Sequence, residues 1–178
     1  MKFCGILLAV TIGIAGCGKR EMASAPSRVT AVEPSLPTKA QPKLRTIKLW
    51  VGPEEITAEM ALTSIQVQTG MMFRTNIPEN EGMIFPLPYP QRASFWMKNC
   101  PASLSAAYMT ADGVIREIHH FEKQDTNAVV AANENIQFVL EMNEAWFQRH
   151  NIKTGAVIRT EYGSLEKTFL HPRQTVAP

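Results

Sequence analysis

The sequence predicts an all-β domain over residues 45–165, built as a compact two-sheet sandwich or an irregular barrel, with two short helices. Short runs of apolar residues recur along this part of the chain. Several runs alternate between apolar and polar residues, as strands with one buried face do. Glycine, proline and asparagine separate the runs and favour turns between them. Many short strands at this spacing are typical of a sandwich or a barrel.

Eight runs are expected to form strands, because each has the length and the content of branched and aromatic residues typical of a strand. They cover residues 45–51, 56–61, 83–87, 93–98, 104–109, 114–121, 136–142 and 156–162. Turn-forming residues connect the runs at Gly52-Pro53, Ala111-Asp112-Gly113 and Thr154-Gly155.

Residues 64–69 are predicted to form the first helix. Thr63 and Gln66 have the spacing of a capping box, in which each side chain accepts a hydrogen bond from the backbone N–H of the other residue. Gly70 follows the segment and commonly ends helices, because glycine adopts the left-handed conformation without strain.

A second helix is predicted at residues 144–150. Asn143 is placed to cap its first turn, and Asn151 can adopt the left-handed conformation that ends it. A helix of this length is marginal without tertiary packing. Trp146 and Phe147 are therefore expected to hold it against the sheet.

The amino-terminal segment predicts export. Lys2 precedes an apolar stretch too short to span a bilayer, which takes about 20 residues. The stretch ends at Cys17 in a pattern that resembles the lipobox of bacterial lipoproteins. Residues 1–16 are therefore expected to be a cleaved signal peptide, and Cys17 to carry a lipid that holds the chain on a membrane. Gly18 resembles the signal for outer-membrane delivery, so the expected location is the cell envelope, facing the periplasm or the exterior.

Composition divides the remaining chain into three parts. Residues 17–44 hold the lipid-bearing cysteine and a proline-rich linker with few large apolar residues. Residues 45–165 are long enough to bury a core of their own. Residues 166–178 are predicted to be a disordered tail.

Net charge argues against nucleic-acid binding, and cysteine content argues against an internal disulfide. The formal net charge of +2 falls to about +1 when Lys2 leaves with the signal, which is too balanced for a protein that binds nucleic acid. Cys4 also leaves and Cys17 is acylated, so no internal disulfide is expected. Cys100 remains and is expected to be a buried, inert thiol, because a nucleophilic role needs a histidine beside it.

No metal or other cofactor is expected. His119 and His120 are consecutive on a predicted strand and therefore point to opposite faces. Thioethers favour soft metals such as copper, but the apolar neighbours of the methionines indicate core packing. The methionines concerned are Met71, Met72, Met83 and Met97.

The stretch SFWMKN, residues 94–99, carries the main candidate binding residues. Strand alternation turns Trp96 and Lys98 to the face opposite the core. Lys98 is expected to be solvated or to line a groove, because lysine is seldom buried without a partner. It could pair with Glu141 if their two strands are neighbours.

Arg74 and Asn99 complete the candidate set. Arg74 could bind a carboxylate or phosphate through two parallel hydrogen bonds, or it could pair with Glu79 or Glu81 and hold the following loop. Asn99 could present its amide to a ligand or close a turn with its side chain. The candidate binding residues are Arg74, Trp96, Lys98, Asn99 and Glu141.

Six segments in a fixed order resemble the DUF192 family. They read TGMMFR (69–74), EGMIFPL (81–87), SFWMKN (94–99), ADG (111–113), VLEMN (139–143) and RHNIKTG (149–155). The resemblance covers about residues 56–160 and implies a small β-rich domain, often behind a signal peptide, without an established activity. Ser105 stands where the family pattern has an acid, so chemistry through that acid is not expected in this chain.

Three functions are open at this stage. The first is a non-catalytic binding module in which Trp96 and its neighbours recognise a cell-envelope glycan or protein. The second is a hydrolase-type enzyme acting on envelope or polysaccharide material, with a site near Arg74, Lys98, Asn99 and Glu141. The third is a structural partner in an envelope complex. An open groove favours the first, a closed pocket with converging titratable groups the second, and an exposed apolar patch the third.

Overall fold

The computed structural model describes residues 36–171. The predicted signal peptide (1–16), Cys17 and residues 172–178 of the predicted tail lie outside this range and remain predictions. The described part is predominantly β, with three short helices, which confirms the predicted fold class. Within it, no helix combines the length and the apolar character needed to cross a membrane.

Residues 36–171 contain ten strands and three helices. The strands are β1 (Thr46–Val51), β2 (Glu54–Met60), β3 (Glu81–Gln91), β4 (Ser94–Phe95), β5 (Leu104–Met109), β6 (Ile115–Phe121), β7 (Val129–Val130), β8 (Ile136–Asn143), β9 (Ile158–Thr160) and β10 (Gly163–Ser164). The helices are α1 (Ser64–Thr69), α2 (Trp146–Arg149) and the π-helix η1 (Glu166–Leu170).

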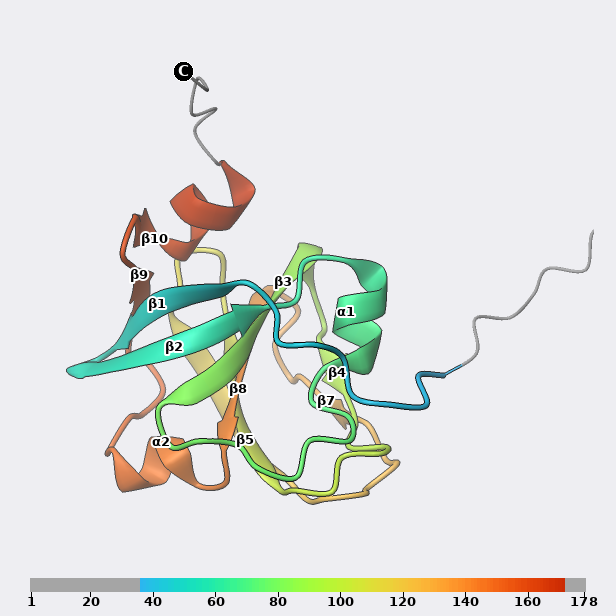
Figure 1. The fold of residues 1–178 in the computed structure, drawn as a ribbon. Coiled ribbons are helices and arrows are strands. Elements are labelled where there is room, and N and C mark those ends of the chain that lie inside the picture. Colours follow the sequence, from blue (N-terminus) through green and yellow to red (C-terminus); the bar gives the residue numbers. More distant parts are fainter. Residues whose placement is uncertain (1–35, 172–178) are drawn as a thin grey trace, which may run out of the picture. The chain divides into compact units, whose positions relative to one another are not determined.

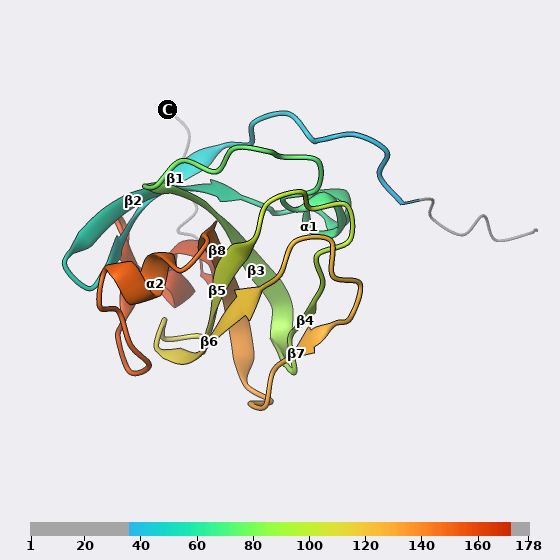
Figure 2. The same ribbon diagram turned by 90° about the horizontal axis from the view of Figure 1, so that it is seen from below.

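Eight strands form one sheet that curls into a half-barrel, in the order β10-β9-β1-β2-β3-β8-β5-β6 (Figures 1 and 2). Neighbouring strands are antiparallel except β2 and β3, which are parallel. Parallel neighbours need a crossover connection, and α1 with the loop after it supplies this connection. Strands β4 and β7 form a separate two-stranded sheet.

The centre of the curled sheet is buried on both faces. One hydrophobic cluster contains Trp146 and Phe147 of α2. The other contains Phe85 of β3 and Phe121 of β6. Between them, residues 136–142 of β8 are all buried. A polar side chain on β8 therefore lies inside one of the two clusters and not in open solvent.

The capping box of α1 is confirmed. The backbone N–H of Gln66 donates to the Thr63 hydroxyl at 3.3 Å, and the N–H of Thr63 donates to the Gln66 side-chain oxygen at 3.0 Å. The helix ends at Gly70, as predicted. This end of α1 forms part of the site described below.

The start of α2 differs from the prediction. Asn143 is the last residue of β8, and its amide donates to the Ile77 carbonyl at 2.6 Å. Its side-chain oxygen accepts from the Arg149 guanidinium at 3.3 Å and not from a backbone N–H of the first helical turn. Ala145 takes the cap position in a left-handed conformation, without a side-chain hydrogen bond. Asn151 adopts the predicted left-handed conformation after the helix, with φ of 54°.

The predicted strand at residues 93–98 is reduced to the two residues of β4. Beyond Phe95 the chain turns, and the N–H of Met97 donates to the Asp125 carbonyl at 2.8 Å, outside any strand pair. Strands β7 and β10 are absent from the prediction, because each has two residues and leaves no periodic pattern.

The predicted disorder from residue 166 is wrong for residues 166–170, which form η1. Phe169 and Leu170 pack against the hydrophobic cluster that contains α2. The hydroxyls of Thr168 and Thr160 are also hydrogen-bonded at 2.7 Å, which joins η1 to β9.

The last residues of the predicted linker are attached to the domain. The side-chain amide of Gln41 donates to the carbonyls of Gln66 at 3.2 Å and Gly70 at 2.9 Å. The N–H of Leu44 donates to the Glu59 carboxylate at 2.6 Å. The chain therefore joins the domain several residues before β1 begins, alongside α1 (Figure 1).

Candidate functional site

A small cavity lies beside Trp96, between the end of α1 and the centre of the sheet. Its volume is about 30 Å³, enough for one water molecule or a group of that size. Residues 67–72 line one part of it, and the remaining lining comes from Phe85, Phe95, Trp96, Cys100 and Glu141. The cavity therefore brings together two predicted binding residues, Trp96 and Glu141.

Glu141 supplies the acidic group of this cavity. It lies on β8, opposite Met83 of β3 and Ala106 of β5. The residue is 4% exposed, and its carboxyl makes no hydrogen bond or ion pair with residues 36–171. Burial raises the pKa of Glu141 to about 8, because the charged form is poorly solvated there. The carboxyl is therefore mostly protonated at neutral pH.

Cys100 lies in the same cavity as a protonated thiol. Burial, together with the nearby Glu141, raises the pKa of Cys100 to about 12. The same causes raise the pKa of Tyr108, whose hydroxyl donates to the Val129 carbonyl at 2.8 Å. Because the thiolate is the nucleophilic form of cysteine, Cys100 is not prepared for nucleophilic attack, in agreement with the predicted inert thiol.

Trp96 joins the cavity to the surface. The residue is 39% exposed, and the ammonium of Lys98 lies 5.3 Å from the centroid of its ring. This is a cation–π contact. The condition for a pair between Lys98 and Glu141 is not met, because β4 belongs to the two-stranded sheet and β8 to the large one.

Arg74 is held in a buried ion pair. Its guanidinium donates two hydrogen bonds to the Glu59 carboxylate, at 2.5 and 2.9 Å. Burial by itself raises the pKa of Glu59, but the hydrogen bonds from Arg74 and from the Leu44 N–H more than offset this and lower it below its ordinary value. Arg74 thus pairs with an acid, as one prediction has it, but Glu79 and Glu81 are paired with other cations.

Asn99 shapes the loops at the edge of the cavity. It adopts the left-handed conformation, with φ of 60°, and its carbonyl accepts a hydrogen bond from the Phe73 N–H at 2.7 Å. This bond ties the loop after α1 to the loop after β4. Asn99 therefore acts through its backbone, and not by closing a turn with its side chain, which was one of its two expected roles. The other role, in which its amide contacts a ligand, stays a prediction.

The sequence interpretation did not identify three of the cavity residues as members of a site. Met71, Met72 and Cys100 line the same cavity as Glu141, although the sequence suggests only core packing for them. Each stands in or directly after the TGMMFR or SFWMKN segment. The signal that could have found them is that both segments also supply candidate binding residues.

Residues 47–160 match the DUF192 family, which is described as an uncharacterized ACR. The chain belongs to the DUF192 family. The resemblance seen in the six segments is therefore confirmed, and with it a family without an assigned activity. A comparison with curated proteins found no match.

Two solved structures share this DUF192 fold. One is from Sinorhizobium meliloti 1021 and carries only the provisional label of a transcription regulator; it is 24% identical, with a TM-score of 0.60 over 65% of this chain and 92% of that chain. The other, from Novosphingobium aromaticivorans DSM 12444, is a protein of unknown function; it is 27% identical, with a TM-score of 0.59 over 72% of this chain and 94% of that chain. Both support the fold.

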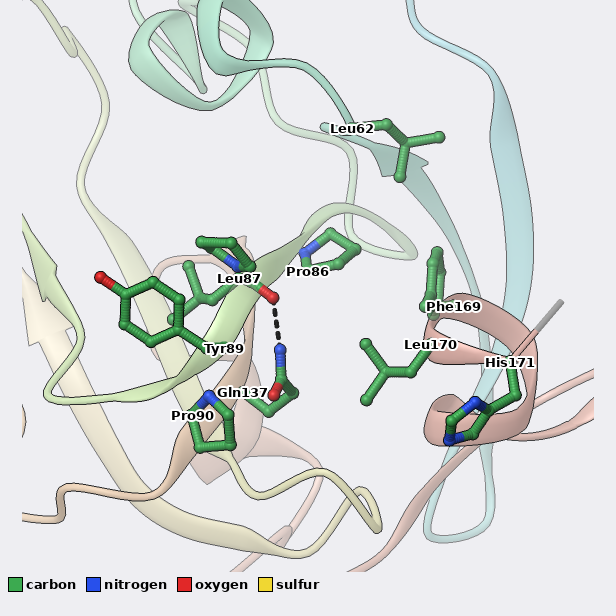
Figure 3. Close-up of a pocket in the computed structure, with 10 residues that line it drawn as sticks. Leu62, Pro86, Leu87, Tyr89, Pro90, Gln137, Phe169, Leu170 and His171 are labelled. Atoms are coloured by element: carbon green, nitrogen blue, oxygen red, sulfur yellow. Dashed lines mark hydrogen bonds between the residues drawn. The ribbon is translucent and has the colours of Figure 1, made fainter.

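A larger groove of about 550 Å³ lies elsewhere on the DUF192 domain, between the proline-rich part of β3 and η1 (Figure 3). Leu62 and Tyr89 are more than half exposed there. The side-chain amide of Gln137 donates to the Leu87 carbonyl between them. The groove is apolar and open, and it contains none of the predicted binding residues.

A third hollow, of about 320 Å³, is polar and is lined in part by Asn76, Ser103 and Asn143. Within residues 36–171, no three His, Cys, Asp or Glu side chains lie close enough together to hold a metal ion.

Proposed function

We propose that this DUF192 protein is a non-catalytic binding module of the cell envelope that recognises an envelope glycan through Trp96. The position of the indole carries the proposal. Trp96 is well exposed beside a cavity that holds a carboxyl, whereas Trp146 is fully buried in the core. An exposed aromatic face next to polar groups suits a sugar, whose apolar face packs on the ring while its polar groups form hydrogen bonds.

The surrounding residues support recognition over hydrolysis. The charge of Arg74 is neutralised by Glu59, and Lys98 lies on Trp96. Hydrolysis needs a substrate bond and an attacking group side by side, and a cavity of about 30 Å³ has room for one group of water size. The residues of the hydrolase alternative therefore do not act on a common substrate atom.

The proposed envelope location depends on a lipid anchor at Cys17. The pattern ending at Cys17 supports lipid attachment there and a location at the outer membrane. The chain with Cys17→Ser should incorporate no labelled palmitate and should leave the membrane fraction. Labelling equal to that of the wild-type chain would contradict attachment at this residue.

Binding to purified cell-wall peptidoglycan tests the glycan proposal. The full-length chain in detergent should sediment with the insoluble glycan, and Trp96→Ala should weaken binding about tenfold or more, as loss of a central aromatic contact does. Tyr162→Ala is the matched control, because Tyr162 is also a well-exposed aromatic residue but lies beside β9. Equal binding by folded Trp96→Ala would rule out the role of the indole, and absence of wild-type binding would rule out this glycan.

A second candidate function is docking of a protein partner in the large groove. The exposed Leu62 and Tyr89 favour it, together with the prolines of β3 (Figure 3). An extended apolar segment of an envelope protein fits such a surface. Crosslinking in intact cells through a photoreactive residue at Tyr89 should then capture one protein, and Leu62→Ser should abolish that product without affecting peptidoglycan binding.

A further inference from the structure

We propose that the cavity beside Trp96 binds the primary ammonium group of a ligand and that Glu141 is its counter-ion. The inference deepens the proposed function, since it names the group that the Trp96 site accepts. It rests on four features of the cavity: an unpartnered acid, neighbouring cations that are engaged elsewhere, an aromatic face and a water-sized volume.

The unpartnered acid is the first feature. Glu141 is 4% exposed, and its carboxyl is not hydrogen-bonded within residues 36–171. A buried carboxylate without a partner is unfavourable by several kcal/mol, so such groups usually have a partner or hold a proton. Glu141 lines the cavity. A cation that enters the cavity can supply the missing partner.

The groups that face Glu141 do not supply this partner themselves. Cys100 and Tyr108 are the titratable side chains whose pKa values respond to it, and both are uncharged at neutral pH. The two cations on neighbouring loops are engaged elsewhere, Arg74 with Glu59 and Lys98 with the indole. A positive charge that replaces the proton of Glu141 would therefore come from a ligand.

Trp96 favours a cation at the entrance. The face of an indole attracts ammonium groups, and Lys98 already makes this contact at 5.3 Å. The end of α1, residues 67–69, also lines the cavity, and the carboxyl end of a helix carries partial negative charge. The indole at the entrance and the end of α1 in the wall therefore both favour a positive charge, as an ionised Glu141 does.

The volume selects the kind of cation. About 30 Å³ accommodates a group of water size, and a primary ammonium has this size with three donors to offer. A quaternary ammonium or a whole sugar ring is too large. The ligand class is therefore an amine-bearing molecule whose aliphatic or sugar part stays at the surface, against Trp96.

A soft metal ion is the competing occupant, because Cys100, Met71 and Met72 also line the cavity. Thiolate and thioether ligands favour copper(I) and silver(I). However, a metal needs the thiolate, and Cys100 holds its proton firmly beside the acid. The observations therefore favour the ammonium group.

An NMR titration of the full-length chain in detergent tests the inference. The indole N–H of Trp96, assigned with Trp96→Phe, is followed while n-butylammonium, 1-butanol or tetramethylammonium is added at about pH 7. We expect saturable binding of n-butylammonium, about thirtyfold tighter than that of 1-butanol, and none of tetramethylammonium. Binding should release protons, because Glu141 ionises as the ammonium enters.

Variants give the deciding comparison. Glu141→Gln should bind n-butylammonium about thirtyfold more weakly, whereas Lys98→Met should bind it equally well or more tightly, since a competing ammonium is removed. Tyr162→Ala, at an exposed aromatic residue that does not line the cavity, should leave binding unchanged. Equal binding of n-butylammonium by wild type and folded Glu141→Gln would overturn the inference. So would a wild-type chain that does not bind n-butylammonium but binds silver(I) through Cys100.

The probe contains no sugar, so the two proposals fail separately. Binding of n-butylammonium without binding of peptidoglycan would retain the ammonium site and reject that glycan. Binding of peptidoglycan that is unaffected by Glu141→Gln would retain the glycan and reject the ammonium site.

Discussion

Two glutamates of this domain are buried to the same extent but are in opposite states. Glu59 and Glu141 are each 4% exposed. Arg74 and the Leu44 N–H donate to Glu59 and lower its pKa. Glu141 has no such donors within the described part of the chain, and burial raises its pKa to about 8. Equal solvent exposure therefore does not determine charge: the donors to Glu59 offset the effect of burial there, and no donor among residues 36–171 does so at Glu141.

Glu59 has a structural role, whereas Glu141 is a candidate for a functional one. At Glu59 the protein provides a bidentate cation and a backbone donor, so that acid is satisfied within the fold. At Glu141 the fold leaves the acid beside a cavity. Perturbed groups of this kind gather at functional sites, so Glu141, and not the ion pair, is the functional candidate.

The largest expected effect comes from making Glu59 resemble Glu141. Arg74→Met should destabilise the fold by about 3–5 kcal/mol, because it leaves a buried carboxylate without its cation. Urea unfolding at neutral pH measures this. The double variant Arg74→Met with Glu59→Gln should recover a large part of the loss; if it is as unstable as the single variant, the ion pair is not the cause.

The next effect concerns the proton on Glu141. Its pKa is raised from 4.5 to about 8, so the folded chain holds a proton that the unfolded chain has lost, and stability falls as the pH rises through this window. Relative to Glu141→Gln, the wild-type chain should lose about 2–3 kcal/mol of unfolding free energy between about pH 6 and about pH 9. Unfolding curves at several pH values check this, and a constant difference between the two chains would contradict a raised pKa.

A smaller effect is expected at the wall of the Glu141 cavity. Thr63→Ala removes the cap of α1 and should cost about 1 kcal/mol. Because residues 67–69 of α1 line the Glu141 cavity and Glu59 does not, the variant should move the carbon-13 titration of Glu141 and leave that of Glu59 unchanged. Shifts at both residues would mean that the two regions are not independent.

The smallest effect is expected from an ion pair in solvent. Lys43 and Glu81 lie 2.9 Å apart with both side chains largely exposed, and such pairs contribute little. Lys43→Met should change the unfolding free energy by less than about 0.5 kcal/mol. It is also the control for Arg74→Met, since both remove a cation from a glutamate.

Local structure could be predicted from the sequence where the signal is local. Residues 64–69 and 104–109 form a helix and a strand with the predicted bounds. A capping box marks the helix, and an apolar run interrupted only by Ser105 marks the strand. The pattern of residues 93–98 is equally regular, yet the chain turns after Phe95. Alternation does not report whether a partner strand is present.

The pairing of charges could not be predicted, because it depends on which segments the fold brings together. The acid beside Arg74 is Glu59, 15 residues earlier in the chain, and not the nearer Glu79 or Glu81. Trp96 and Glu141 were predicted as site residues and do line one cavity. The unpartnered state of Glu141 could not be foreseen, because it follows from β8 being an interior strand.

The place of β8 in the sheet also has a consequence for the order of folding. Strands β1 and β2 form a hairpin, as do β5 and β6, so these pairs need only short loops to close. Strand β8 pairs with β3 and β5, which precede it by many residues and therefore cost more chain entropy to bring together. We expect the two hairpins to form early and β8 to insert late. A nascent chain released before β8 is synthesised would then lack both the continuous eight-stranded sheet and the Glu141 side of the cavity.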